Sequence, residues 1–404
     1  MMTIRQWIIS IAIVTAGCNS GDKHEQLLSN ATQDASCPFM TTTPDGHTVI
    51  SWVETAKGAD TGTLYYAVSA DKGRTFSAPR RVATANGILP HAENMPKMVF
   101  KPDGEVIAIY GVEQNDARNK YAGRVYYTRS LNGGETWLPA VPLVTDTGSY
   151  DQRYFDIALL PGGEAAAIWL DNRKAVDAEG SSLYFAVTDG RDGFKKERAL
   201  AETVCQCCRT DLYTDAQGGI HIAFRDIIND SIRDMVHMVS TDGGNAFSKL
   251  NRISADNWVV RGCPHTGPAM TKNKQSMHFT WFTMGGGEGV YYCQSTDNGQ
   301  TYTQKQKVSI APMAKHPQIA TLADDRILLV WDEPVKQPDN TFKSRVGYQW
   351  RDGGGKVLQT GVLTTDSTHV TYPVITGVDD GTVLMAYTQR AGDLQQVRCM
   401  LVKQ

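Results

Sequence analysis

The chain has 404 residues, of which 41% are hydrophobic, and its 43 acidic and 40 basic side chains give a formal net charge of −3. This is the composition of an ordinary globular protein. The slight acidic excess leaves no basic surface that could displace counterions from a phosphate backbone, so nucleic acid is not an expected partner. No apolar run reaches the ~18 residues that suggest a membrane-spanning helix.

The N-terminal segment has the features of an export signal. Residues 1–5 carry one positive charge, residues 6–14 form a short apolar run, and the small residues 15–17 precede Cys18. The arrangement resembles a bacterial lipoprotein signal, which implies a lipid on Cys18, although Thr15 stands where that family usually has Leu. A plain secretory signal is the alternative. Either signal predicts an extracytoplasmic protein of the bacterial cell envelope, in the periplasm or on the outer membrane, where disulfides can form.

The remaining chain repeats one unit, in which a short strand, a Gly or Asp turn and an apolar strand follow one another. The turns of the seven copies lie near Asp45, Asp103, Gly162, Gln217, Asn273, Asp324 and Asp380. The copies are roughly 51 to 59 residues apart, which suits a four-stranded blade with its loops. The sequence therefore predicts an all-β, seven-bladed β-propeller as a single domain over residues 25–404, after a short tether at residues 19–24. Residues 25–29 are expected to complete the last blade and close the ring.

Four hairpins of the repeat carry a second motif, which begins with Ser-x-Asp or Ser-x-Asn and continues through Gly to an aromatic residue. The four segments are residues 69–76, 130–137, 240–247 and 295–302. They resemble the Asp-box, or BNR repeat, of sialidase-like propellers, which implies a sialidase-like fold with six blades as the alternative count. We expect the acid to accept hydrogen bonds within its own turn and the Gly to supply a positive φ. These residues are therefore predicted to be structural.

The same resemblance raises a sialidase-type glycosidase as a candidate function. Sialidases hold a carboxylate with three arginines and use a tyrosine nucleophile assisted by a glutamate. Tyr372 matches the position of that tyrosine, and Arg153 and Arg209 are the candidates for the carboxylate clamp. Two departures weigh against the activity, because Ser36 stands where the first arginine of the family would be and no Glu follows the strand after Tyr372.

In a propeller, the loop that enters the innermost strand of each blade leads into a central funnel. The residue about eight positions before each turn is therefore expected to lie at the same height of this funnel in every blade. The residues found there are Cys37, Met95, Tyr154, Cys208, His265, His316 and Tyr372. Thiols, a thioether and imidazoles are soft donors that favour copper or zinc over magnesium or calcium. Together with neighbouring cysteines, the candidate metal ligands are Cys37, Met95, Cys205, Cys207, Cys208, Cys263, His265 and His316.

A disulfide is the other interpretation of the cysteines. Cys207 or Cys208 could pair with Cys263 in an oxidising compartment. Three functions remain open: a propeller whose funnel binds a soft metal, as an enzyme or a carrier; a glycan-directed propeller, catalytic or only binding; and a protein-interaction scaffold with structural disulfides. The first is favoured by a small margin. The expected partners are a small molecule or glycan in the funnel and a membrane through Cys18, and no motif fixes a substrate.

Overall fold

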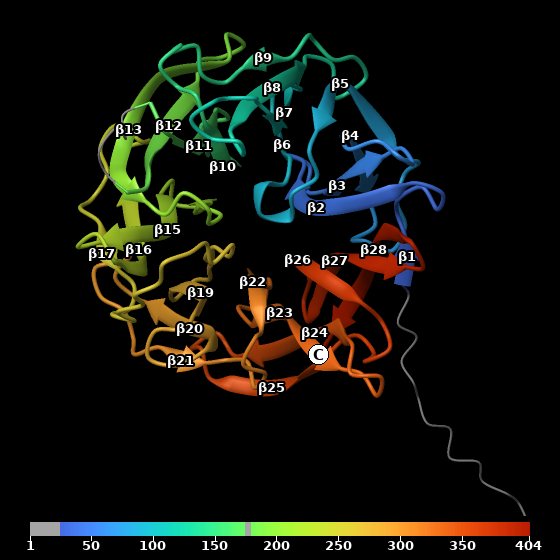
Figure 1. Cartoon of the computed structure of the whole chain (residues 1–404), viewed down its shortest axis with the longest axis vertical. Helices are drawn as coiled ribbons and strands as arrows, with labels where there is room; N and C mark the ends of the chain where they lie inside the picture. Colours follow the sequence, from blue (N-terminus) through green and yellow to red (C-terminus); the bar gives the residue numbers. More distant parts are fainter. Residues whose placement is uncertain (1–24, 174–178) are drawn as a thin grey trace, which may run out of the picture.

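The computed structural model describes residues 25–173 and 179–404. The expected export signal, with Cys18, lies outside these residues. Within them the chain forms 28 β-strands and one short 3-10 helix, and the strands surround a central axis as the blades of a β-propeller do (Figure 1). No helix in this part of the chain is long and apolar enough to cross a bilayer.

The strands make five hydrogen-bonded sheets, two of which contain eight strands. The first eight-stranded sheet comprises β2 (Asp34–Thr42), β3 (Thr48–Thr55), β4 (Gly62–Ser69), β5 (Arg80–Ile88), β6 (Lys97–Phe100), β7 (Val106–Glu113), β8 (Gly123–Ser130) and β9 (Val141–Pro142), and η1 (Ala92–Asn94) precedes β6. The second comprises β10 (Gln152–Leu159), β11 (Ala165–Asp171), β12 (Ser181–Thr188), β13 (Phe194–Val204), β14 (Asp211–Thr214), β15 (Ile220–Ile228), β16 (Ile232–Ser240) and β17 (Asn251–Arg252). In each, the first four and last four strands are joined by one residue pair, Ile88 with Val112 and Val204 with Asp226.

The other three sheets contain four strands each. One comprises β18 (Ala269–Lys272), β19 (Met277–Thr283), β20 (Gly289–Ser295) and β21 (Gln306–Lys307), and the next comprises β22 (Lys315–Thr321), β23 (Ile327–Lys336), β24 (Phe342–Arg351) and β25 (Val357–Val362). The last comprises β26 (Val370–Asp379), β27 (Thr382–Ala391), β28 (Leu394–Lys403) and β1 (Glu25–Leu27). All seven strand–turn–strand units expected from the sequence are therefore present as antiparallel hairpins.

The N-terminal strand pairs with the last strand of the chain, as expected. Glu25 lies opposite Met400 and Leu27 opposite Arg398 in the antiparallel ladder of β1 and β28. The backbone N–H of Leu28 continues this pairing by donating to the Val397 carbonyl at 3.0 Å. One sheet thus joins both ends of the described chain (Figure 1).

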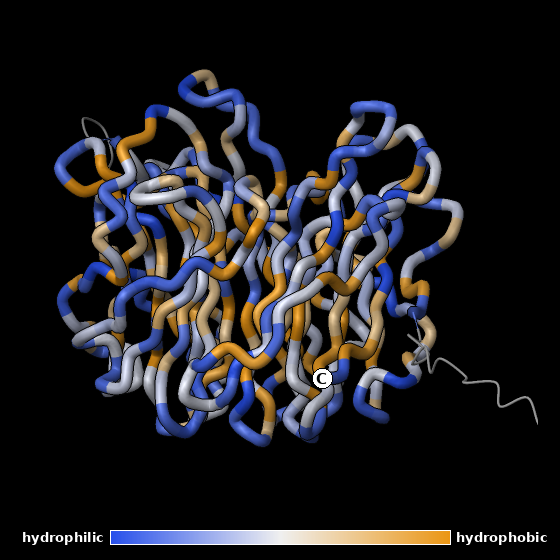
Figure 2. The backbone as a smooth tube through the Cα atoms, turned by 90° about the horizontal axis from the view of Figure 1, so that it is seen from below, coloured by the Kyte–Doolittle hydropathy of each residue, from blue (hydrophilic) through white to orange (hydrophobic). Residues whose placement is uncertain are grey.

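The hydrophobic core lies between neighbouring groups of strands and not on the axis. Val99, Ile107 and Ile109 of β6 and β7 pack with Phe155 and Trp169 of β10 and β11 in one buried cluster. Figure 2 shows the same distribution, with hydrophobic stretches along the strands and mostly hydrophilic loops at the two faces. Burial between blades fixes the ring and leaves the loops at its centre available for polar side chains.

Several second strands carry a buried Trp whose indole N–H donates to an acid two residues later. The pairs are Trp52 with Glu54 at 2.8 Å, Trp169 with Asp171 at 3.2 Å and Trp331 with Glu333 at 2.8 Å. Each bond satisfies the one polar atom of an otherwise apolar side chain in the core. The period-2 spacing places both residues on the same face of the strand.

The turns of the four Ser-x-Asp/Asn segments have the expected hydrogen bonds. In the first, Asp71 accepts from the backbone N–H of Thr75 at 2.8 Å, Ser69 Oγ accepts from the N–H of Gly73, and Gly73 has a positive φ of 83°. The equivalent residues at the other three turns are Asn132, Asp242 and Asp297, and each accepts the same bond through a side-chain oxygen. These residues stabilise their own hairpins, which is the structural role that the sequence predicted.

Candidate functional site

The positions that the sequence placed at one height of the funnel share an unusual backbone conformation. Five of the seven have positive φ: Cys37 at 60°, Tyr154 at 51°, His265 at 50°, His316 at 49° and Tyr372 at 51°. In four of them the strand register shifts at the same point, as at a β-bulge. A non-glycine residue in this conformation costs on the order of 1 kcal/mol or more, and such strain concentrates at functional sites.

The axis itself is nearly filled by side chains. A cavity of about 10 Å³ is lined there by residues that include Cys37, Met95, Arg209, His316 and Tyr372. This is close to the volume that one water molecule needs, and no sugar ring could enter it. The axis therefore does not provide a substrate site in this conformation.

Charged groups at the axis pair with one another. The buried Arg209 Nη1 lies 3.3 Å from Oε1 of the buried Glu93. His316 Nδ1 lies 2.8 Å from Asp332 Oδ2, which also accepts a hydrogen bond from the backbone N–H of Tyr372. Burial, followed by the negative charges of Glu93 and Asp332, raises the pKa of Tyr372. A phenol in this environment resists ionisation and is a poor nucleophile.

An open cleft of about 700 Å³ lies beside the axis. It is lined by Leu89, His91, Asn94, Gly111, Val112, Glu113, Arg118, Asn119, Tyr121, Ala122, Gly123, Tyr150, Arg153, Tyr154, Asn172, Gln206, Cys207, Cys263 and His265. A cleft of this size can hold part of a sugar chain, and its aromatic and basic side chains suit an acidic carbohydrate. Among the described lining residues, Glu113 is the only carboxylate.

Two histidines and a tyrosine meet in this cleft. The ring centroids of His91 and Tyr154 are 6.0 Å apart, and those of His91 and His265 are 6.3 Å apart. Different segments supply them: His91 precedes η1, Tyr154 occupies the bulge of β10, and His265 lies in the loop before β18. The bulge at Tyr154 has the positive φ described above, so the local backbone geometry sets the direction of this side chain.

Burial shifts the pKa values of His91 and Tyr154 in opposite directions. Burial lowers the pKa of His91; the charge of Glu93 opposes this effect, and His265 and Arg153 add to it. Burial also raises the pKa of Tyr154, although the charge of Arg153 opposes it. At neutral pH the imidazole is therefore uncharged and able to accept a proton, while the phenol keeps its proton and can donate it.

Arg153 is held in the wall of the cleft by a buried carboxylate. Its Nη2 lies 2.6 Å from Oδ2 of Asp151, and the same oxygen accepts hydrogen bonds from the side chains of Asn119 at 2.8 Å and Asn172 at 3.1 Å. The guanidinium carbon of Arg153 lies 5.8 Å from the ring centroid of Tyr154. With five donors and one near partner, Arg153 retains N–H groups for an anionic ligand.

Arg118, which is exposed, and Tyr150, which is half-buried, form a second part of the cleft wall. The guanidinium of Arg118 lies 3.9 Å from the ring centroid of Tyr150, and Asp116 holds it through Nη2 at 2.7 Å. A planar cation stacked on an aromatic ring offers both a charged edge and an apolar face to a sugar.

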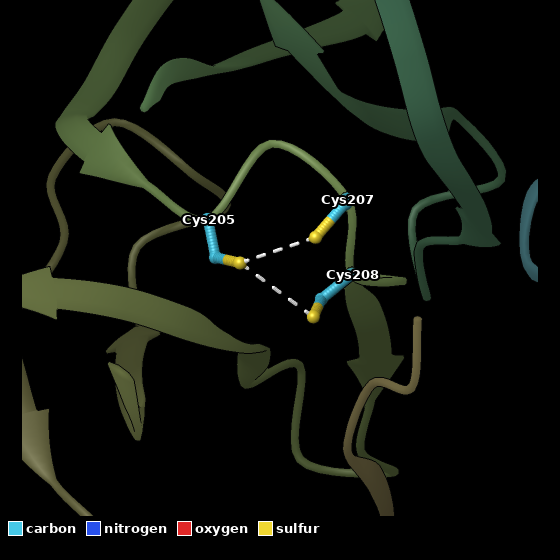
Figure 3. A group of neighbouring side chains, drawn as sticks. All are labelled: Cys205, Cys207 and Cys208. Atoms are coloured by element: carbon cyan, nitrogen blue, oxygen red, sulfur yellow. Dashed lines mark hydrogen bonds between the residues drawn. The ribbon is translucent and has the colours of Figure 1, made fainter. Parts of the chain in front are cut away.

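The eight candidate metal ligands lie at three places. Cys37, Met95 and His316 line the small axial cavity, and Cys263 and His265 line the cleft. Cys205, Cys207 and Cys208 form the only group of His, Cys, Asp or Glu among the described residues whose ligand atoms could hold one metal ion, and these sulfurs lie within 4.8 Å of one another (Figure 3). Cys207 of this group also lines the cleft, but the other candidates do not join the three cysteines, so a single eight-residue site does not form.

No disulfide joins the cysteines of the described chain. Cys207 and Cys208 are buried, whereas Cys263 is exposed, and all three are free thiols. Cys293 and Cys399 are buried within β20 and β28, in keeping with a packing role. The expected pairing of Cys207 or Cys208 with Cys263 is therefore not formed here.

The candidate sialidase residues also separate. Tyr372 and Arg209 line the axial cavity, and Arg153 lines the cleft. The residues predicted from the sequence did not include His91, Asn94, Arg118 or Tyr150, all of which line the cleft. A usable signal was present, because His91 and Asn94 flank the segment that leads into the predicted funnel position Met95.

Comparison with known proteins places the fold but not the function. No protein-family model matches the chain, and no curated protein matches its sequence. One similar solved structure is the polysaccharide lyase Uly1, with a TM-score of 0.55 and 12% identity over 96% of this chain and 94% of that one. A protein of unknown function from Dyadobacter fermentans DSM 18053 has a TM-score of 0.52 and 13% identity over 94% of this chain and 98% of that one. The NanB sialidase from Streptococcus pneumoniae has a TM-score of 0.52 and 11% identity over 94% of this chain and 70% of that one. The chain has a sialidase-like β-propeller fold.

Proposed function

We propose that this protein is a polysaccharide lyase that cleaves an acidic, uronate-containing glycan in the cleft beside its axis. The observation that carries the proposal is the meeting of His91 and Tyr154, with ring centroids 6.0 Å apart, beside Arg153 in an open cleft. The three side chains provide a base, an acid and a carboxylate-binding cation, which are the groups that β-elimination requires.

In the proposed reaction, Arg153 binds the carboxylate of a uronate residue. His91 removes the proton from the carbon next to that carboxylate, and the electron pair moves into an enolate whose negative charge Arg153 stabilises. The pair then forms a carbon–carbon double bond as the glycosidic carbon–oxygen bond on the next carbon breaks. Tyr154 gives its proton to the leaving oxygen. The reaction consumes no water and changes no net oxidation state.

Hydrolysis suits this cleft less well. Most glycosidases place two carboxylates across the scissile bond, and Glu113 is the only carboxylate among the described residues of the cleft wall. The sialidase alternative would use Tyr372, whose cavity of about 10 Å³ is too small for a sugar. Among the similar structures, one is named as a polysaccharide lyase, the reaction class that the cleft side chains suit.

Two finer parts of the proposal concern the number of blades and the place of the protein in the cell. Dividing the eight-stranded sheets at the single pairs Ile88–Val112 and Val204–Asp226 gives seven groups of four strands, which favours a seven-bladed propeller closed by β1. The signal before Cys18 favours a lipid-anchored protein of the cell envelope, where an extracellular polysaccharide can reach the cleft. Replacing Cys18 with Ser should then move the protein from the membrane fraction to the soluble fraction.

A panel of uronate polysaccharides tests the activity. Polygalacturonate, alginate, chondroitin sulfate and other uronate glycans are incubated with the purified chain, and the ultraviolet absorbance of the conjugated double bond reports elimination. We expect Tyr154→Phe and His91→Gln each to lower kcat by about 10²-fold or more, the usual contribution of a general acid or base. Tyr372→Phe is the matched control, because it removes a tyrosine hydroxyl at the axis, outside the cleft, and should leave the rate unchanged.

The outcomes separate the two glycan-directed functions. New reducing ends without a conjugated double bond would contradict elimination. Release of sialic acid from a sialoside, abolished by Tyr372→Phe and unaffected by Tyr154→Phe, would assign the protein as a sialidase.

A further inference from the structure

Three thiols gather in the loop between β13 and β14, apart from the groups that the proposed reaction uses. The sulfur of Cys205 lies 3.6 Å from that of Cys207 and 3.7 Å from that of Cys208, and all three sulfurs are within 4.8 Å of one another (Figure 3). A turn brings them together, because the backbone N–H of Cys208 donates to the Cys205 carbonyl at 3.4 Å. The cluster is thus a property of four consecutive residues.

The sulfur spacing matches a shared metal ion. With metal–sulfur bonds of about 2.3 Å, three thiolates around one ion lie about 4 Å apart when trigonal and about 3.8 Å apart when part of a tetrahedron. The recorded separations of 3.6 and 3.7 Å need only small side-chain rotations to reach these values. All three residues are buried, with exposed fractions of 0%, 4% and 1% in chain order, so water is largely excluded from the sulfurs.

Two buried arginines supply positive charge beside the thiols. Arg233 Nη1 donates to the sulfur of Cys205 at 3.2 Å. Arg225 is fixed by hydrogen bonds from its guanidinium to the carbonyls of Arg233 at 2.9 Å and Phe282 at 2.8 Å, and its charge acts on Cys205 and Cys208. Three thiolates with a monovalent cation carry a net charge of −2, which these guanidinium groups offset in part, because Arg233 also pairs with Glu179.

We propose that Cys205, Cys207 and Cys208 bind one copper(I) ion through three sulfurs. Thiolates are soft ligands that select copper(I) or zinc. Structural zinc sites take four protein ligands, and among the described residues no further His, Cys, Asp or Glu atom joins this group. Cys207 also lines the open cleft, which gives the ion a path to the buried sulfurs.

Binding involves no electron transfer. Each metal–sulfur bond forms as a thiol releases its proton to solvent, and copper stays in its monovalent state throughout. The three sulfurs are not the base or the acid of the proposed reaction, although Cys207 lines the same cleft.

Competition with a chromogenic copper(I) chelator tests the site. The reduced protein is titrated with copper(I) under anaerobic conditions, and we expect one ion per chain to resist the chelator and to raise Tm, because the ligands are held together only in the folded state. Cys205→Ser and Cys208→Ser should lose this ion. Cys263→Ser is the matched control, since it removes an exposed thiol outside the group and should retain it.

X-ray absorption on the copper-loaded wild type covers the case in which the serine variants fold poorly. Three sulfur neighbours at about 2.3 Å would support the proposal. Retention of zinc that copper(I) does not displace, loss of copper in Cys263→Ser, or a titration of the unreduced wild type that finds two of the three thiols oxidised to a disulfide would each overturn it. None of these results bears on elimination, so failure here is distinguishable from failure of the proposed enzyme.

Discussion

The side-chain oxygen of Asn94 accepts a hydrogen bond from the backbone N–H of Tyr154 at 2.7 Å. This bond joins the end of η1 to the bulge of β10, which belongs to the next group of strands. Because His91 lies at the start of the same short helix, the bond fixes the position of the proposed base relative to the proposed acid. Asn94 is therefore a positioning residue of the proposed site.

The first prediction follows from this bond. Asn94→Ala should lower kcat between about tenfold and about 100-fold, because loss of the acceptor frees the bulge that directs Tyr154. Asn94→Asp keeps an acceptor oxygen at the same place and should restore most of the activity. Equal losses in both variants, measured by the absorbance assay, would show that Asn94 acts in some other way.

The second prediction concerns pH. A general base must be unprotonated, and burial lowers the pKa of His91 below its usual value of about 6.5. We expect kcat/KM to be constant near neutral pH and to fall only as the pH drops through this lowered pKa. The raised pKa of Tyr154 predicts no alkaline loss below about pH 10, the ordinary tyrosine value. An acid limb centred above pH 6.5 would argue against His91 as the base.

The third prediction concerns the axis, where the rings of His316 and Tyr372 stack with centroids 3.9 Å apart. Burial lowers the pKa of His316, but the charge of Asp332 and its hydrogen bond outweigh burial and raise the pKa overall. The charged imidazole therefore stabilises the folded state most fully below the unfolded pKa of about 6.5, and this contribution disappears as the pH rises through the raised folded pKa.

His316→Gln tests this dependence. Below pH 6.5 the variant should be less stable than the wild type by about 1–3 kcal/mol in the free energy of unfolding, the usual value for a hydrogen bond to a charged group. The difference should shrink at higher pH in chemical denaturation. A difference that stays constant across the titration would exclude the ion pair with Asp332 as its cause.

The fourth prediction concerns Asp211, which is half-buried at the start of β14. Burial and the nearby charge of Asp156 raise the pKa of Asp211 to about 7, although Arg209 and Lys97 oppose the increase. Because the folded pKa exceeds the unfolded one, its contribution to stability is present below pH ~4 and is lost as the pH rises to about 7.

Asp211→Asn should remove that loss. The amide oxygen can still accept the hydrogen bond that the Met270 backbone N–H makes to Asp211 at 2.7 Å. At pH 8 the variant should therefore unfold at a higher denaturant concentration than the wild type. Its free energy of unfolding should be larger by at least about 1.4 kcal/mol, the free energy of one pKa unit. At pH 4 the two should be nearly equal, and a variant less stable at both pH values would contradict the assignment.

The repeat made much of the fold predictable. Short turns fix the spacing within each first hairpin, so a count from Asp45 or Asp324 reaches Cys37 or His316 at the same bulge. The pairing of residues 25–27 with β28 followed from the missing strand of the last unit. Local geometry, repeated along the chain, carries this information.

The grouping of side chains around the axis was not predictable in the same way. A count along the strand gives height but not direction, and the positive φ at Tyr154 turns its side chain toward the cleft and away from a common metal site. The loop that contains His91 and Asn94 has no equivalent spacing in the other units. The three cysteines were found as a cluster because they are adjacent in sequence, whereas the distance of Cys263 from them depends on a long loop.

The ladder between β1 and β28 also constrains when the molecule can finish folding. Tyr387 donates a hydrogen bond to Glu25 across a separation of 362 residues, so one sheet needs both the first and the last described segments. During synthesis the first strand emerges early and must wait, unpaired, until translation of β28 is complete. Chaperones and proteases of its compartment would therefore meet a nearly complete chain with one strand still missing, and a truncation of only the last ten residues would leave that strand without a partner.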